Sequence, residues 1–138
     1  MCLALNIFKM LNKTKKSIFG QFGEELATGY LIKRGYKIVA RNHLIKWDEI
    51  DIVAKQADGT LVMCEVKTLK GNPGFPEGFM PEDKLNGLKY KKMARAAQTF
   101  AAQHPDLIDE ARGWRLDLIA IVLDESNNLM DLRHYENI

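Results

Sequence analysis

Residues 47–68 read WDEIDIVAKQADGTLVMCEVKT, and this stretch decides the fold. Two runs within it, 49–54 and 61–68, have the apolar and β-branched composition of strands, and the dipeptide Asp58-Gly59 between them is a turn signal. We therefore predict a β-hairpin. Its open end carries Asp51 on the first strand and Glu65 and Lys67 on the second.

The length of the turn decides which side chains meet at that open end, because a one-residue slip in register moves every side chain of a strand to the opposite face. A two-residue Asp58-Gly59 loop would place Asp51 opposite Val66. A three-residue loop with Gly59 in the left-handed bulge position would place Asp51 opposite Glu65. We favour the three-residue loop, which brings the two carboxylates together.

Asp51, Glu65 and Lys67 form a candidate catalytic set, since the period of a strand puts Glu65 and Lys67 on one face. Two carboxylates and an ammonium group beside apolar neighbours are costly to bury without compensation. Mg²⁺ or Mn²⁺ would compensate them, with Asp51, Glu65 and the Val66 carbonyl as oxygen ligands. Lys67 could then orient a water nucleophile or stabilise charge on phosphorus. The alternative is a salt bridge at a strand end, because short D…ExK patterns often arise by chance.

Length and composition set outer limits on this interpretation. The 138 residues suffice for one domain, and 46% hydrophobic content is ordinary for a globular protein. The formal net charge is only +2, so affinity for nucleic acid would have to come from local basic patches. Two cysteines are too few for a disulfide framework, which favours a reducing cytoplasm, and Cys64 fits a small core residue. The apolar start is too short to span a bilayer. We expect an N-terminal extension over 1–16, helical or loose, and a single domain over 17–138.

A first helix is predicted from Ser17, which can cap it, to about Arg34, with Gly35 as a left-handed stop. One side of this helix carries little bulk and could approach a sheet closely, with Gly20, Gly23, Ala27 and Leu31 at helical spacing. Glu24 shares that side and could be aimed at the carboxylates. An acid in the first half of a helix is also explained by the helix dipole alone.

A second helix is predicted from Glu82 or Leu88 to Gln103, ending ahead of His104-Pro105. One side of it is basic and could follow a phosphate backbone, through Lys84, Lys91, Lys92 and Arg95. A solvated lysine face explains the same pattern. Its expected core stripe is Tyr90, Met93, Ala97 and Phe100.

The remaining segments complete a sheet. Residues 36–41 alternate as a half-buried strand, and Arg41 at its end is a candidate phosphate contact. The glycine- and proline-rich segment 70–81 is either a loop over the site or a plain connector. The nearly unbroken apolar run 116–123 predicts a central strand, and 129–135 predicts an edge strand.

Five motifs follow one another along the chain. They are GQFGEELATGYLIKRGYKIVARN at 20–42, WDEIDIVA at 47–54, MCEVKT at 63–68, KYKKMARAAQTF at 89–100 and RLDLIAIV at 115–122. Together they resemble the YraN-like family of small bacterial proteins over about residues 20–122. That family is predicted to have the restriction-endonuclease-like fold and is similar to archaeal Holliday junction resolvases.

The resemblance implies a nuclease core of the PD-(D/E)xK type, with Asp51, Glu65 and Lys67 as catalytic positions and Glu24 as a fourth member. It also marks further family positions, which are Arg41, Asn42, Arg115 and Asp117. This chain departs from the family pattern at Asp48, where a glycine is usual. The aspartate adds an acid beside the expected site.

We therefore expect an α/β fold, a restriction-endonuclease-like core with a mixed β-sheet flanked by helices in the order α-β-β-β-α-β plus an edge strand. The expected function is Mg²⁺- or Mn²⁺-dependent phosphodiester hydrolysis on DNA, with branched or flapped DNA as candidate substrates. The alternatives are a nucleic-acid-binding module without useful catalysis and a structural or adaptor protein. We expect nucleic acid, most simply DNA, as the partner, no membrane association and a cytoplasmic location. Whether the protein forms a homodimer stays an open question.

Overall fold

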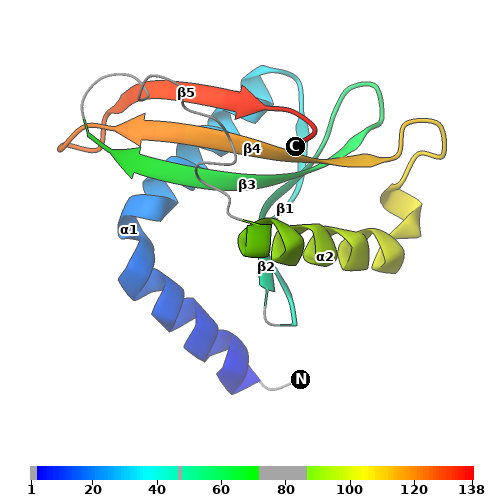
Figure 1. Cartoon of the computed structure of the whole chain (residues 1–138), viewed down its shortest axis with the longest axis horizontal. Coiled ribbons are helices and arrows are strands. Elements are labelled where there is room, and N and C mark those ends of the chain that lie inside the picture. Colours follow the sequence, from blue (N-terminus) through cyan, green and yellow to red (C-terminus); the bar gives the residue numbers. More distant parts are fainter. Residues whose placement is uncertain (1–2, 47, 72–86) are drawn as a thin grey trace.

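A five-stranded mixed sheet with the strand order β1-β2-β3-β4-β5 forms the centre of the molecule (Figure 1). The computed structural model describes residues 3–46, 48–71 and 87–138, with side chains from residue 18 onward. The strands are β1 (Lys37–Ile45), β2 (Asp48–Lys55), β3 (Leu61–Lys70), β4 (Trp114–Leu123) and β5 (Leu129–Tyr135). The helices are α1 (Leu3–Lys33) and α2 (Gly87–Gln103), with a short 3-10 helix η2 (Pro105–Leu107) after α2. The predicted α/β class and element order are confirmed.

The β2–β3 hairpin has the turn that the sequence favoured. Gly59 has a φ of +100°, and the Gln56 N–H donates to the Thr60 carbonyl over 2.9 Å. The ladder continues from there to the pair Ile52 and Cys64. This is the register of the three-residue loop, which confirms the prediction.

The parallel pair of β3 and β4 holds the two halves of the chain together. It runs from Leu61 beside Trp114 to Lys70 beside Leu123, and β5 adds an antiparallel edge to β4. Every residue of the run 116–123 is buried, as expected of a central strand covered on both faces. The predicted bounds of the edge strand, 129–135, are confirmed.

Helix α1 begins at Leu3 and not at Ser17, so the expected cap at Ser17 is wrong. The physical reason is that residues 3–19 contain no glycine or proline that would stop a helix from extending toward the N-terminus. The start of α1, dark blue in Figure 1, extends away from the sheet. Its C-terminal stop is confirmed, because Gly35 has a φ of +87° and the Tyr36 N–H donates to the Leu31 carbonyl over 3.0 Å.

Further along, α1 lies very close to β3. A Cβ atom added to Gly23 would collide with the Thr68 side chain. Ala27 and Leu31, on the same side of the helix, are fully buried. The predicted small-residue side is confirmed at these positions, and it brings the neighbouring Glu24 against the sheet.

The two helices cover opposite faces of the sheet, with a separate apolar cluster under each. The cluster under α1 includes Ile52, Cys64 and Ile119, and the cluster under α2 includes Met63 and Phe100. Cys64 is buried as predicted, and burial raises the pKa of its thiol.

Helix α2 starts at Gly87, close to the later of the two expected starts, and ends at Gln103 as predicted. Ala97 and Phe100 are buried, but Tyr90 of the expected core stripe is exposed and its hydroxyl donates to the Ile138 carbonyl over 3.1 Å. The segment expected over 70–81 lies mostly outside the described residues. Within the described chain, no helix is both long and apolar enough to cross a membrane.

Candidate metal and nucleic-acid site

The sheet forks at Asp51. The β2–β3 ladder ends at Ile52 and Cys64, and β2 continues along β1, where Ile50 pairs with His43. Ile50 belongs to the apolar cluster under α2 and Ile52 to the one under α1. Residues two apart share one face of a regular strand, so β2 must twist strongly at Asp51.

The side chain of Asp51 bridges β2 and β3 at the point where the two strands separate. Its Oδ2 accepts a hydrogen bond of 2.9 Å from the Val66 N–H of β3. A backbone donor that would otherwise have lost its ladder partner is thereby satisfied. This bond fixes the position of the Asp51 carboxylate relative to β3.

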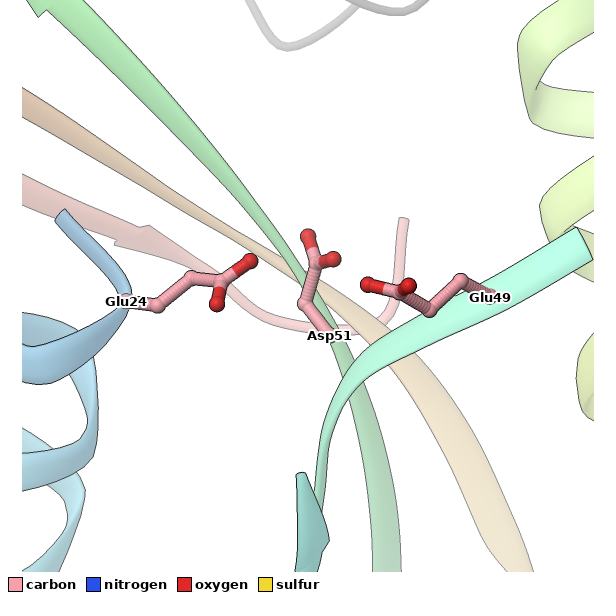
Figure 2. A group of neighbouring side chains, drawn as sticks. All are labelled: Glu24, Glu49 and Asp51. Carbon is pink, nitrogen blue, oxygen red and sulfur yellow. The ribbon is translucent and has the colours of Figure 1, made fainter. Parts of the chain in front are cut away.

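Three carboxylates meet at this place. Glu24, Glu49 and Asp51 each offer an oxygen, and these oxygens lie within 4.8 Å of one another. Figure 2 shows the Asp51 carboxylate between that of Glu24, from α1, and that of Glu49, from β2, with all three directed toward a common space. Glu24 is only 6% exposed. Like charges this close are stabilised by a cation, and carboxylate oxygens are the donors that hard divalent ions take, so the cluster is compatible with a divalent metal site.

Glu49 was missed from the sequence. The signal was present, because Glu49 and Asp51 are two residues apart on one strand and so point the same way.

Glu65 lies beside this cluster and forms an ion pair with a lysine of α2. Its Oε1 is 3.2 Å from the Nζ of Lys89 on α2, and Glu65 and Glu49 both line a small pocket of about 10 Å³. Lys67 follows two residues later and is half-buried. Lys89 was also missed, although it begins the KYKK motif.

The carboxylates that the structure brings together are therefore not the set expected as metal ligands. Asp51 is joined by Glu24 and Glu49 in the cluster, while Glu65 contacts Lys89 and Val66 contributes its N–H to Asp51. The Glu65 and Val66 ligand roles stay predictions.

The expected nucleic-acid-binding residues divide between two places. Arg41 on β1 donates from Nη1 to Glu25 of α1 over 2.8 Å. On α2, Lys91 and Lys92 are exposed, and the Arg95 guanidinium lies 3.8 Å from the Asp48 carboxylate. Lys84 lies outside the described residues.

A second polar group surrounds Asp117 of β4, which is 0% exposed. Its carboxylate accepts hydrogen bonds from Arg115 Nε at 2.9 Å and from the Asn137 N–H at 3.0 Å, and His134 Nε2 lies 2.7 Å away. Arg115 also donates to Gln56 and to the Tyr36 hydroxyl. Burial alone would raise the pKa of Asp117, but hydrogen bonds from His134, Arg115 and Asn137 hold it below its usual range.

This Asp117 network joins three elements at one point. The Asp117 carboxylate accepts a hydrogen bond from His134 Nε2, and the Tyr30 hydroxyl lies 3.1 Å from His134 Nδ1. The network therefore ties the end of α1 to β4 and β5. The family positions Arg115 and Asp117 have a structural role here.

Comparisons with known proteins place the chain in a sequence family. A model of the family described as "Uncharacterised protein family UPF0102" matches residues 23–121. A UPF0102 protein of Corynebacterium efficiens is 33% identical over 126 residues, which cover 91% of this chain and 95% of that protein. Another from Caldicellulosiruptor bescii is 37% identical over 110 residues, covering 80% of this chain and 87% of that protein.

Two solved structures are similar at a low level. A repair endonuclease from Pyrococcus abyssi has a TM-score of 0.35 and 14% identity over 70% of this chain, which spans about a third (32%) of that protein. SfsA of Pyrococcus furiosus, in complex with Ca²⁺, has a TM-score of 0.31 and 14% identity over 83% of this chain and 60% of that one. Likeness at this level leaves the function to be argued from the site.

Proposed function

The chain belongs to the UPF0102 family, the YraN-like family that its sequence resembles, and we propose that it hydrolyses phosphodiester bonds of DNA with Mg²⁺ or Mn²⁺. One observation carries the proposal. Glu24, Glu49 and Asp51, from a helix and a strand far apart in sequence, direct oxygens into one space where the sheet forks. The proposal includes a cytoplasmic location and leaves open a homodimer for substrates with two-fold symmetry.

The donor set fits such an ion. Mg²⁺ is commonly held by one or two carboxylates, while waters and substrate phosphate complete its shell. Glu24 is nearly buried, and a buried carboxylate among other carboxylates gains most from a cation. The Val66 N–H holds one oxygen of Asp51 in place, so the carboxylate is oriented before any ligand arrives. When bound, a divalent ion would polarise the phosphate and make water a stronger nucleophile at neutral pH.

The lysines of β3 and α2 supply the remaining chemistry in this proposal. Lys67 shares its face of β3 with Glu65, where its ammonium group orients the attacking water or stabilises charge developing on phosphorus. Lys89 holds Glu65 by an ion pair. The exposed Lys91 and Lys92 follow the DNA backbone, a role that releases counterions and makes affinity depend on salt.

A second candidate is a nucleic-acid-binding module without useful catalysis. Two observations favour it. Lys89 engages Glu65, and Asp48, in place of the usual family glycine, pairs weakly with the exposed Arg95 of α2. Both contacts would have to be compatible with a bound phosphate for the chemistry to proceed.

Cleavage assays decide between the candidates. The substrates are labelled duplex, flapped, four-way-junction and single-stranded DNA with Mg²⁺ or Mn²⁺. We expect Lys67→Ala to keep DNA affinity but lose cleavage by on the order of a hundredfold or more, and Asp51→Asn to lose cleavage and metal binding together. Glu125→Gln, in the exposed turn before β5, is the matched control and should retain full activity.

The outcomes separate cleanly. Wild-type binding with no cleavage of any substrate would favour the binding module. Cleavage that appears only in Asp48→Gly would identify Asp48 as the cause. A wild type that cleaves while Lys67→Ala cleaves equally well would remove Lys67 from the reaction.

A further inference from the structure

A cavity of about 500 Å³ lies beside Glu24 and is lined by residues of α1 and of the middle of β1. Its volume is within the range of small-molecule sites. Glu24 lines the cavity and also belongs to the cluster. In the β1–β2 ladder the pairs Arg41 with Ile52 and His43 with Ile50 place Asn42, a second wall residue, beside Asp51. Whatever occupies the cavity is therefore next to the proposed reaction centre.

The outer wall of the cavity is apolar and open to solvent. Ile18 and Phe22 are 64% and 44% exposed and follow each other by one helical turn on α1. Phe22 offers an aromatic face at the mouth of a concave surface. Such an exposed ring is a platform on which a planar ligand can stack.

The cavity is also lined by hydrogen-bonding groups. Gln21 and Asn42 contribute amides, which can pair with donor and acceptor edges. Arg41 also lines the cavity and donates from Nη1 to Glu25 over 2.8 Å.

The charge of the walls argues against an anion in the cavity itself. Glu24 and Glu25 both line it, and Glu25 already compensates the Arg41 guanidinium. A phosphate group would meet carboxylates here. A neutral, planar heterocycle with a polar edge matches both the stacking surface and the amides.

We propose that this cavity binds the base of an unpaired nucleotide adjacent to the scissile phosphate, so that the substrate is DNA with a single-stranded segment. The proposal rests on the proposed nuclease function. A base inside a duplex is covered by its stacked neighbours and paired at its edge, and cannot enter a concave site without being extruded. Phe22 stacks on the base, Gln21 and Asn42 contact its edge, and the following phosphate reaches the carboxylate cluster past Glu24.

The test measures binding without cleavage. Fluorescence anisotropy with Mg²⁺, in a Lys67→Ala background that keeps DNA affinity but not cleavage, compares three labelled DNAs. They are a duplex with a short flap, the same duplex whose flap nucleotides are all abasic, and the duplex with no flap. The two flaps carry equal charge, so a difference between them reports the bases alone. We expect this protein to prefer the intact flap over the abasic flap by about fivefold or more, the scale of base stacking on an aromatic side chain.

Further variants in the same background link that preference to the cavity. Phe22→Ala should remove the difference between intact and abasic flaps, because the two changes delete the same contact and are not additive. Phe22→Tyr keeps an aromatic face and should retain the preference. Ile32→Ala, at another exposed apolar position of α1 outside the cavity, is the matched control and should also retain it. Circular dichroism melting checks that each variant is folded.

Other results overturn the proposal. Equal affinity of the Lys67→Ala protein for all three DNAs, or no binding of any of them, would overturn it. A Phe22→Ala protein that keeps the preference for the intact flap would also overturn it. If the only effect of Phe22→Ala were a change of oligomeric state in size-exclusion chromatography, Ile18 and Phe22 would instead contact a second copy of the chain. Cleavage of plain duplex with equal affinities removes the cavity proposal and leaves the nuclease. Loss of flap preference in Phe22→Ala without any cleavage leaves the cavity and removes the nuclease.

Discussion

Asp51 and Asp117 are aspartates on strands of one sheet, yet their surroundings are opposite. Around Asp117, a guanidinium, an imidazole and a backbone N–H converge on one carboxylate that is fully buried. Around Asp51, two further carboxylates approach within 4.8 Å, and Asp51 and Glu49 are only half-buried. One group is assembled from opposite charges and the other from like charges.

The difference indicates which group holds the fold together and which binds something. Donors and acceptors of the Asp117 network satisfy one another, so it gains nothing from a ligand and loses much if one member is removed. The carboxylate cluster brings like charges together, an arrangement that an added cation would stabilise. Stability and binding should therefore respond in opposite ways to substitutions at the two places.

The largest effect is expected from removing the cation of the Asp117 network. Arg115→Met leaves a buried carboxylate without its guanidinium, and breaking such a pair costs about 3–5 kcal/mol in the free energy of unfolding. Urea unfolding followed by circular dichroism measures it. Arg95→Met, which removes an exposed arginine of α2, should change stability by less than about 1 kcal/mol. An Arg115→Met protein as stable as the control would contradict the structural role of the network.

The opposite response is expected at the carboxylate cluster. Saturating Mn²⁺ should stabilise the wild type by about 2.7 kcal/mol at a hundredfold excess over its Kd, because the ion binds the folded state. In the variant Glu49→Gln with Asp51→Asn this gain should vanish, while Glu125→Gln should keep it. Differential scanning calorimetry with and without metal gives the shift, and isothermal titration gives the Kd. A wild type that binds no divalent ion at millimolar concentration would remove the metal site.

A smaller effect is expected in the pH dependence of stability, to which Asp117 contributes. The pKa of Asp117 is lowered in the folded protein, so its contribution to stability is fully present above the unfolded value of about 3.9. That contribution is lost as pH falls through the folded pKa. Unfolding free energies measured between pH 6 and pH 3 should therefore fall toward the acid end. In Arg115→Met the Asp117 part of this slope should become shallower, since one cause of the lowered pKa is gone, and an unchanged slope would contradict it.

The sequence predicted what local chemistry determines. The Ala57-Asp58-Gly59 loop was enough to fix the hairpin register, and Gly35 was enough to end α1. The predicted start of α1 at Ser17 was wrong. A residue that can act as an N-cap marks the beginning of a helix only where the residues before it cannot extend the helix. The family resemblance, and not the spacing of residues, made Glu24 a site member.

The parts that could not be predicted depend on tertiary geometry. Glu24 reaches the fork because Gly23 lets α1 touch Thr68, and no local pattern states which strand a helix will approach. The twist of β2 at Asp51 places Ile50 and Ile52 in the apolar clusters on opposite faces of the sheet, contrary to the regular alternation of a strand.

The parallel pairing of β3 with β4 has a consequence for the order in which the protein is made. The candidate site residues Glu24 to Lys67 all lie ahead of the crossover, but β3 receives its second neighbour only when Trp114 follows Leu61, about fifty residues later. At ordinary translation speeds of about 5–20 residues per second, this leaves one edge of β3 open for roughly 3 to 10 seconds. An unpaired edge is where strands of other chains add. The half of the molecule with the carboxylates is thus synthesised first and enclosed last, and newly made chains are most exposed to misassembly during that interval.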